Sequence, residues 1–231
     1  MVYTKELFDE RVAEIEIFYN ELIRFYEEDR NDVLSISKST FIIMLYNLIE
    51  ACIREGFKEI YEKIHDETPT HESLNEPLVE KWIGKVIKDN KNNPEAYLKK
   101  LLLQLIILPP REVTIGRIQG LQSISSGNLD KKNINELLKD HGIDTRRSNR
   151  LRVGESTITV RKFRNDLSHG NISFKNAMND YAVEAGEMSI SKIKEDVLNY
   201  MESVIEDMNE FYTNRLYLKQ LDNENIEEGL I

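Results

Sequence analysis

Residues 190–212, ISKIKEDVLNYMESVIEDMNEFY, decide the fold of this chain. Apolar side chains recur there every three or four positions, which is the spacing of one face of an α-helix. These are Ile190, Ile193, Val197, Met201, Val204, Met208 and Phe211, with Leu198, Ile205 and Tyr212 at the edges of the face. The face is about 140° wide, more than the seam of a two-stranded coiled coil. We therefore expect a helix from Ser189 or Ser191 to about Leu218, packed within a multi-helix bundle.

Two more long helices are expected in the N-terminal part of the chain. Residues 4–29 and 38–65 both carry an apolar residue every three or four positions. The break at 31–35 is short, so the two helices are predicted to form an antiparallel pair. Gly56 inside the second helix indicates a place where another helix crosses closely. Residues 66–77 have turn chemistry and no apolar period, and so predict a loop.

Shorter helices are expected in the middle of the chain. Residues 78–88 form one, with Trp82 as a core anchor, and residues 94–108 form another that ends at two prolines. A third runs over 131–141, with Asp130 as its N-cap. His141 is expected to neutralise the end of that helix, where Gly142 follows. An arginine-rich turn is expected after it.

These elements predict an all-α fold, a multi-helix bundle of long antiparallel helices. At 231 residues the chain is expected to be one domain, with a short irregular and basic insertion over about 109–158 and a frayed acidic tail over 222–231. No apolar run approaches the ~18 uninterrupted residues of a membrane span, so no membrane partner is expected. The lone Cys52 lies in an apolar helical run, which favours a core residue in a reducing cytoplasm.

Charge is distributed unevenly along the chain. The net charge is −10, yet residues 146–164 hold seven basic residues against one acidic residue, Glu155. These seven are Arg146, Arg147, Arg150, Arg152, Arg161, Lys162 and Arg164. A positive zone on an acidic body can attract an anionic ligand. The alternative is that the arginines over 146–152 pair with acidic helices of the same chain.

The densest group of chemically useful side chains lies in residues 161–174, RKFRNDLSHGNISF. An apolar step of three and four, from Val160 to Phe163 and on to Leu167, predicts a helix over 159–169 that ends at Gly170. The polar side chains then fall on the other side of this helix.

Three of these polar side chains can act together. Asn165 and His169 are i, i+4 neighbours, and Arg164 can reach across to them with its long side chain. The guanidinium offers permanent charge and two-pronged geometry for a phosphate. Histidine exchanges protons near neutral pH. The set therefore indicates acid–base chemistry on a phosphate group.

This pattern resembles the signature of the HEPN superfamily (higher eukaryotes and prokaryotes nucleotide-binding domains). That signature is an arginine, four to six residues and a histidine, often with a polar residue such as asparagine directly after the arginine. Here it reads Arg164, Asn165 and His169. The preceding stretch GNLDKKNINELLKDHGI, over residues 127–143, is similar to the toxin-type bacterial branch of the superfamily.

The resemblance implies a two-fold dimer whose motifs line one cleft and cleave RNA without a metal or another cofactor. His169 would then act as general base or acid, Arg164 would stabilise the transition state, and Asn165 would position the phosphate. Ser168 and Asp166 are supporting candidates. The partner is expected to be single-stranded RNA, because the chemistry needs the 2′-hydroxyl. A toxin of this kind can also have an antitoxin protein as a partner.

On this interpretation the RNA backbone would follow the basic zone, whose candidate contacts are Arg146, Arg147, Arg150, Arg152, Arg161 and Lys162. Two alternatives stay open. One is a non-catalytic HEPN-like module that binds a nucleotide or a protein. The other is a helical scaffold in which Arg164 and Asp166 belong to salt bridges and His169 caps a helix end.

Overall fold

A computed structural model describes residues 1–27, 31–89, 128–150, 153–177 and 190–220, together with residues 95 and 99. The named helices are α1 (Val2–Glu27), α2 (Asn31–Glu67), α3 (Glu76–Asp89), α5 (Lys131–Lys139), α6 (Arg146–Arg150), α7 (Ser156–Ser168) and α9 (Ile190–Thr213). An isolated β-bridge pairs Leu74 with Leu218. The predicted all-α fold is confirmed.

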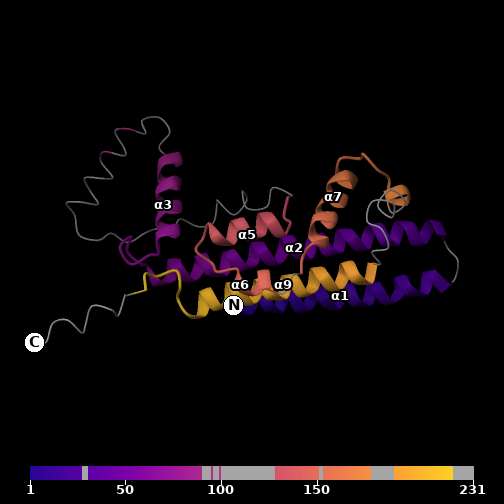
Figure 1. Ribbon diagram of the computed structural model, residues 1–231, viewed down its shortest axis with the longest axis horizontal. Helices are drawn as coiled ribbons and strands as arrows, with labels where there is room; N and C mark the ends of the chain where they lie inside the picture. Colours follow the sequence, from indigo (N-terminus) through magenta and orange to yellow (C-terminus); the bar gives the residue numbers. More distant parts are fainter. Residues whose placement is uncertain are drawn as a thin grey trace, which may run out of the picture.

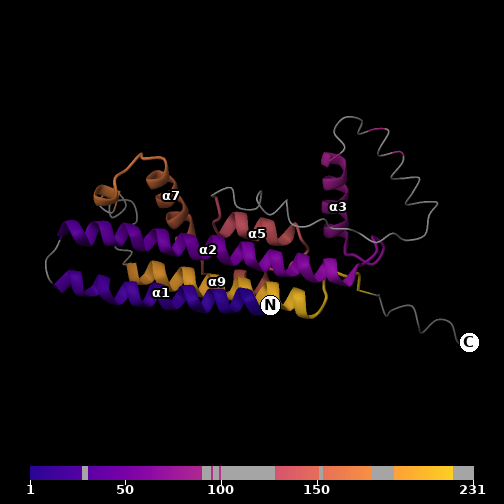
Figure 2. The same ribbon diagram turned by 180° about the vertical axis from the view of Figure 1, so that it is seen from behind.

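Three long helices, α1, α2 and α9, form the body of the molecule (Figures 1 and 2). Two ion pairs show how α1 and α9 are aligned. Lys5 of α1 pairs with Glu202 of α9 at 3.7 Å, and Lys194 of α9 pairs with Glu16 of α1 at 2.7 Å. These pairs show that α1 and α9 are antiparallel. The helix α1 is also antiparallel to α2, as predicted, whereas α2 and α9 run in the same direction.

The core lies between these three helices. From α2 come Phe41, Leu45, Tyr46, Leu48, Ile49, Cys52, Ile53 and Phe57, none of which exposes any surface. The expected close crossing at Gly56 is confirmed, since a Cβ there would come within 2.6 Å of Met208 Cε in α9. Burial raises the pKa of the Cys52 thiol to about 12, which agrees with its expected place in the core.

Among the described helices, α2 alone is long and apolar enough to cross a membrane by length and composition. Half of that apolar window is buried inside the bundle. A helix that is apolar around most of its circumference is found either in a protein core or in a membrane, and in this structure α2 supplies the central core residues.

Helix ends are held by side chains from other helices. The buried Glu59 of α2 accepts hydrogen bonds from the backbone N–H groups of Tyr3 and Thr4, at 3.2 and 2.8 Å, and so caps the start of α1. One helical turn further along α2, Lys63 donates to the carbonyl of Tyr212 near the end of α9 at 2.9 Å. Such contacts satisfy backbone groups that a helix end cannot pair internally.

The ends of two long helices differ from the sequence prediction. The helix α9 ends at Thr213 rather than near Leu218, because Arg215 adopts a left-handed backbone (φ 53°) and the chain turns to pair with residues 73–75. The expected break over 31–35 is helical and belongs to α2. Leu34 is buried, so the apolar face of α2 already begins there.

The region expected to be an irregular insertion contains two short helices, α5 and α6, where it is described. The turn predicted after residue 143 is therefore corrected, since it includes the five-residue α6, whose Arg147 contacts α9. The helices α5 and α7 lie on the same side of α2, with α7 inclined to the long axis (Figure 1). The first part of the predicted insertion, over 109–127, the tail over 222–231 and most of the helix predicted over 94–108 lie outside the described residues.

Candidate active site at the end of α7

The start of α7 is fixed by contacts with α9. Both carboxylate oxygens of Asp196 accept backbone N–H groups, from Gly154 and Ser156, each at 2.7 Å. A carboxylate at this position also suits the positive end of the helix dipole. Gly154 has φ 92°, and a Cβ there would come within 2.6 Å of the Tyr200 ring. Both the backbone angle and the close approach therefore require glycine.

The body of α7 follows the predicted pattern. Val160 and Phe163 are buried, Leu167 packs against the core, and the polar residues of the motif lie toward the surface. At the far end, Gly170 is left-handed (φ 70°) and donates to the carbonyl of Leu167 at 3.1 Å, while Asn171 donates to the carbonyl of Asp166 at 2.9 Å. These two bonds form a Schellman motif.

His169 occupies the residue just before that glycine. It has φ −87° and ψ 0°, and its backbone N–H donates to the carbonyl of Asn165 at 3.0 Å. The residue is exposed. Its imidazole is therefore placed on the surface at the end of the helix, where a substrate can reach it.

Arg164 is half-buried and is held from two directions. Its Cζ lies 4.9 Å from the centre of the Tyr46 ring, a cation–π arrangement, and its Nη1 donates to Oδ1 of Asn165 at 3.2 Å. Tyr46 is fully buried in α2, and its hydroxyl accepts the backbone N–H of Leu129 at 3.4 Å. The core of the bundle thus supports the face of the guanidinium.

Asn165 extends the contact to the segment before α5. Its Nδ2 donates to Oδ1 of Asn128 at 3.2 Å. The side chains of Arg164, Asn165 and Asn128 therefore form one continuous chain, with His169 one helical turn beyond Asn165. The expected grouping of Arg164, Asn165 and His169 on one part of α7 is present in the structure.

The supporting candidates lie beside this group. Asp166 is partly buried and its Oδ1 accepts from Nδ2 of Asn171 at 3.4 Å, while Ser168 is exposed on the last turn. Lys162 is exposed two residues before Arg164.

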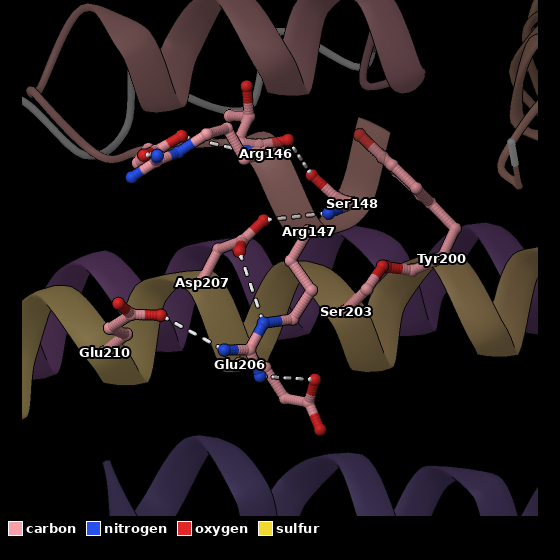
Figure 3. A network of polar contacts seen from close by, with 10 residues as sticks. Arg146, Arg147, Ser148, Tyr200, Ser203, Glu206, Asp207 and Glu210 are labelled. Carbon is pink, nitrogen blue, oxygen red and sulfur yellow. Dashed lines mark hydrogen bonds and ion pairs between the residues drawn. The ribbon is translucent and has the colours of Figure 1, made fainter. Parts of the chain in front are cut away.

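Arg147, from the basic zone, faces acidic residues of α9 (Figure 3). It pairs with Glu206 at 3.1 Å, with Glu210 at 3.1 Å and with Asp207 at 3.8 Å. The hydrogen bond with Glu206 and the nearby carboxylates raise the pKa of this guanidinium. The expected alternative, in which these arginines bind acidic helices of the same chain, describes Arg147.

Asp207 joins α6 to α9 in the same network. It accepts the backbone N–H of Ser148 at 3.1 Å and is 5% exposed (Figure 3). Burial raises the pKa of its carboxyl group, and the bonds from Ser148 and the charge of Arg147 oppose that rise. Asp207 therefore depends on these partners to remain ionised inside the fold.

Two other arginines of the basic zone also make ion pairs within the chain. Arg146 pairs with Asp144, two residues away, and Arg161 pairs with the buried Asp130 at 2.9 Å. Arg150 belongs to α6, but its side chain, like the whole of Arg152, lies outside the described residues. The arginines that the structure describes between residues 144 and 161 therefore make ion pairs within the chain.

His141 is buried, unlike His169. Its Nδ1 lies 2.6 Å from the carbonyl of Leu137 and its Nε2 lies 2.7 Å from the hydroxyl of Tyr61. Burial lowers the pKa of His141 to about 4. The predicted neutralisation of the α5 end by a charged imidazole is therefore replaced by a hydrogen bond from a neutral one. Within the described residues, no group of three or more His, Cys, Asp or Glu is arranged to hold a metal ion.

Two residues of the site were not identified from the sequence, Tyr46 and Asn128. Tyr46 lies within an apolar helical pattern and is indistinguishable there from a core residue. Asn128 stands next to the helix-capping Asp130, so its sequence context favours a role in the turn. The contacts that these residues make with α7 depend on the tertiary fold.

The bundle, with an arginine, four residues and a histidine at the end of an inclined helix, is the arrangement of a HEPN domain. A comparison with protein-family models agrees, since the model described as HEPN_MAE_28990-like HEPN matches residues 5–217. The chain belongs to this HEPN family. Neither the curated proteins nor the solved structures give a significant match.

Proposed function

We propose that this protein is an endoribonuclease that cleaves single-stranded RNA in the cytoplasm by attack of the ribose 2′-hydroxyl. The observation that carries the proposal is the surface group at the end of α7. It places a titratable imidazole, His169, one turn from an amide and a guanidinium, Asn165 and Arg164, that are already fixed by other contacts.

In the proposed reaction, a base removes the proton of the 2′-hydroxyl, and the 2′-oxygen forms a bond to the adjacent phosphorus. The bond from phosphorus to the 5′-oxygen then breaks, and that oxygen takes a proton from an acid. The products are a 2′,3′-cyclic phosphate and a 5′-hydroxyl. His169 supplies the base or the acid. Arg164 stabilises the charge on the phosphorane-like transition state.

Asn165 has a positioning role in this scheme. Its Oδ1 is occupied by Arg164 and one Nδ2 proton by Asn128, which leaves its second amide proton to contact a substrate phosphate. Neither the acid–base step nor the stabilisation by Arg164 requires a metal ion, so cleavage is expected to continue in EDTA.

The test uses purified protein, single-stranded RNA and EDTA, with His169→Ala and Arg164→Ala as comparison variants. The expected result is cleavage by the wild type and a large loss in both variants. Equal cleavage by all three proteins would overturn the proposal. If the wild type binds a nucleotide or a partner protein but does not cut RNA, the non-catalytic HEPN-like module is favoured instead.

A homodimer is part of the proposal, because one histidine per chain supplies either the acid or the base. An exposed apolar surface supports it. Phe174 is 43% exposed and its carbonyl accepts from Ser39 of α2 at 2.7 Å, and α2 itself carries the exposed Val33 and Ile36. Light scattering at micromolar concentration is expected to give twice the chain mass, and a monomer would contradict this part.

We also propose a toxin or phage-defence role, supported by the resemblance of residues 127–174 to the toxin-type branch. Induced expression in a bacterial host is expected to stop growth, and His169→Ala is expected to relieve the arrest. An antitoxin partner would be identified by its ability to restore growth when co-expressed with the wild type. Equal arrest by both forms would contradict a role for RNA cleavage.

A further inference from the structure

The amides next to Arg164 have a defined polarity. A guanidinium can only donate hydrogen bonds, so Asn165 must present Oδ1 to Arg164. The other end of the Asn165 amide, Nδ2, then faces Asn128, and Asn128 must present its own oxygen. Because Arg164 can only donate, it determines the orientation of both amides. The hydrogen bond to Asn128 then holds the Asn165 amide in that orientation.

Asn128 is itself attached to a rigid part of the fold. Its carbonyl accepts from Nδ2 of Asn133 in the first turn of α5, at 2.5 Å. Two residues on, Asp130 caps α5 by accepting the backbone N–H of Asn133 at 2.9 Å and also pairs with Arg161 of α7. The segment 128–130 is thus connected to both α5 and α7.

The same segment supports the second contact of Arg164. Leu129 donates its backbone N–H to the hydroxyl of Tyr46, whose ring lies under the guanidinium. Residues 128 and 129 therefore fix the edge of Arg164 through Asn165 and its face through Tyr46. Both contacts are with neutral groups, so they orient the guanidinium without neutralising its charge.

We propose that Asn128 is a positioning residue, which holds the Arg164 guanidinium through Asn165 in the orientation needed at the scissile phosphate. The proposal rests on the proposed function for the consequence in catalysis, but the orientation itself can be measured without RNA. An acceptor oxygen at position 128 is the required feature. Removal of that oxygen releases the Asn165 amide to rotate and lets Arg164 leave the orientation that the Tyr46 ring and Asn165 share.

Three variants test this proposal. Asn128→Ala removes the acceptor, Asn128→Ser shortens the side chain so that its oxygen no longer reaches Asn165, and Asn128→Asp keeps an acceptor at the same place. Asn214→Ala, which truncates an exposed asparagine directly after the C-terminal end of α9, is the matched control. Circular dichroism melting shows whether each variant is folded.

The first measurement is RNA cleavage. Asn128→Ala and Asn128→Ser are expected to lower kcat about 10- to 100-fold with little change in KM, because the charge of Arg164 stays while its orientation is lost. Asn128→Asp is expected to lose less than about tenfold in kcat, with its added negative charge appearing as a higher KM. Wild-type kcat in folded Asn128→Ala would overturn the proposal.

The second measurement is ¹⁵N NMR of the Arg164 guanidinium, assigned with Arg164→Lys. The expected result is a restrained guanidinium in the wild type, in Asn128→Asp and in Asn214→Ala, and a mobile one in Asn128→Ala and Asn128→Ser. If the wild type does not cut RNA, the proposed function fails while this measurement still decides the role of Asn128. Unchanged Arg164 mobility in Asn128→Ala would overturn that role whatever the activity.

Discussion

Two helices in this protein end in the same dipeptide, His141-Gly142 after α5 and His169-Gly170 after α7. Both glycines are left-handed, with φ 76° and 70°. The backbone bonds also match, since Ile143 donates to Leu138 at 3.0 Å and Asn171 donates to Asp166 at 2.9 Å. Yet His141 is 4% exposed and bonded at both ring nitrogens, whereas His169 is exposed.

The residue after the glycine separates the two cases. Ile143 is buried and draws the α5 end into the core, while Asn171 is polar and leaves the α7 end at the surface. Two arginines also differ: Arg147 of α6 is surrounded by carboxylates of α9, whereas the described contacts of Arg164 are to a ring and an amide. The two helix ends therefore share the same dipeptide and backbone geometry, and contacts with the rest of the fold determine which histidine is exposed.

The largest expected difference is between alanine substitutions of the two histidines. His169→Ala is expected to lower RNA cleavage by about 10²- to 10⁴-fold, the usual contribution of a general acid or base, with little loss of stability. His141→Ala is expected to destabilise the fold by about 2 to 4 kcal/mol, because it leaves a cavity and an unpaired tyrosine hydroxyl. Cleavage assays and urea unfolding distinguish them, and the comparison fails if both variants lose only stability.

The two arginines provide the next largest contrast. Arg164→Ala is expected to reduce kcat by about 10²- to 10³-fold through loss of transition-state stabilisation. Arg164→Lys is expected to recover only part of this, because an ammonium lacks the planar two-pronged geometry. Arg147→Ala is expected to lower the melting temperature and leave kcat unchanged. A similar loss of kcat in Arg147→Ala would show that the basic zone takes part in the reaction.

A pH dependence of stability is expected from His141. Its pKa in the folded protein is about 4, below the usual value near 6.5, so between these values the unfolded chain binds a proton that the folded chain does not. Stability is therefore complete above pH 6.5 and falls by about 3 kcal/mol as the pH drops to about 4.

The matched variant for this measurement is His141→Gln, which removes the titrating group. Urea unfolding at several pH values between 7.5 and 4.5 is expected to show a shallower decline in the variant than in the wild type. Carboxylates contribute equally to both proteins, so the difference between the curves isolates His141. Parallel curves would contradict the buried, neutral state of this residue.

The smallest expected effects concern the N-terminal caps of α5 and α7. Asp130 caps α5 from within its own segment, whereas Asp196 of α9 caps α7 from the other side of the fold. Asp196→Ala is expected to cost about 0.5 to 2 kcal/mol in urea unfolding, the usual range for a lost cap. It is also expected to loosen the α7 amides in hydrogen exchange, and faster exchange confined to α5 would contradict this assignment.

Local features of the fold were predictable from the sequence. Apolar periodicity places α1 and α5 close to their observed bounds and predicts α2 and α9 with one end displaced, and the cap at Asp130 and the glycines at 142 and 170 mark helix ends through neighbouring residues alone. The position of Arg164, Asn165 and His169 at the end of one helix follows from the same local pattern. These features depend on contacts a few residues apart.

The remaining features depend on contacts far apart in the chain. Neither the three carboxylates around Arg147 nor the Asp196 cap on α7 has a signal in the sequence, because each partner is one acidic residue among many on an acidic helix. For the same reason the sequence assigned Arg161 to an RNA path, whereas in the structure it pairs with Asp130. A count of charges could not show which arginines are paired within the chain.

The most direct test of the central claim compares two oligonucleotides that differ in one 2′-hydroxyl at the site of cleavage, incubated with the wild type and with His169→Ala in EDTA. Mass spectrometry of the products is expected to show a 2′,3′-cyclic phosphate only from the wild type acting on the all-ribose strand. Cleavage of the 2′-deoxy strand at the same position, or unchanged cleavage by His169→Ala, would contradict the assignment of this chemistry to the end of α7.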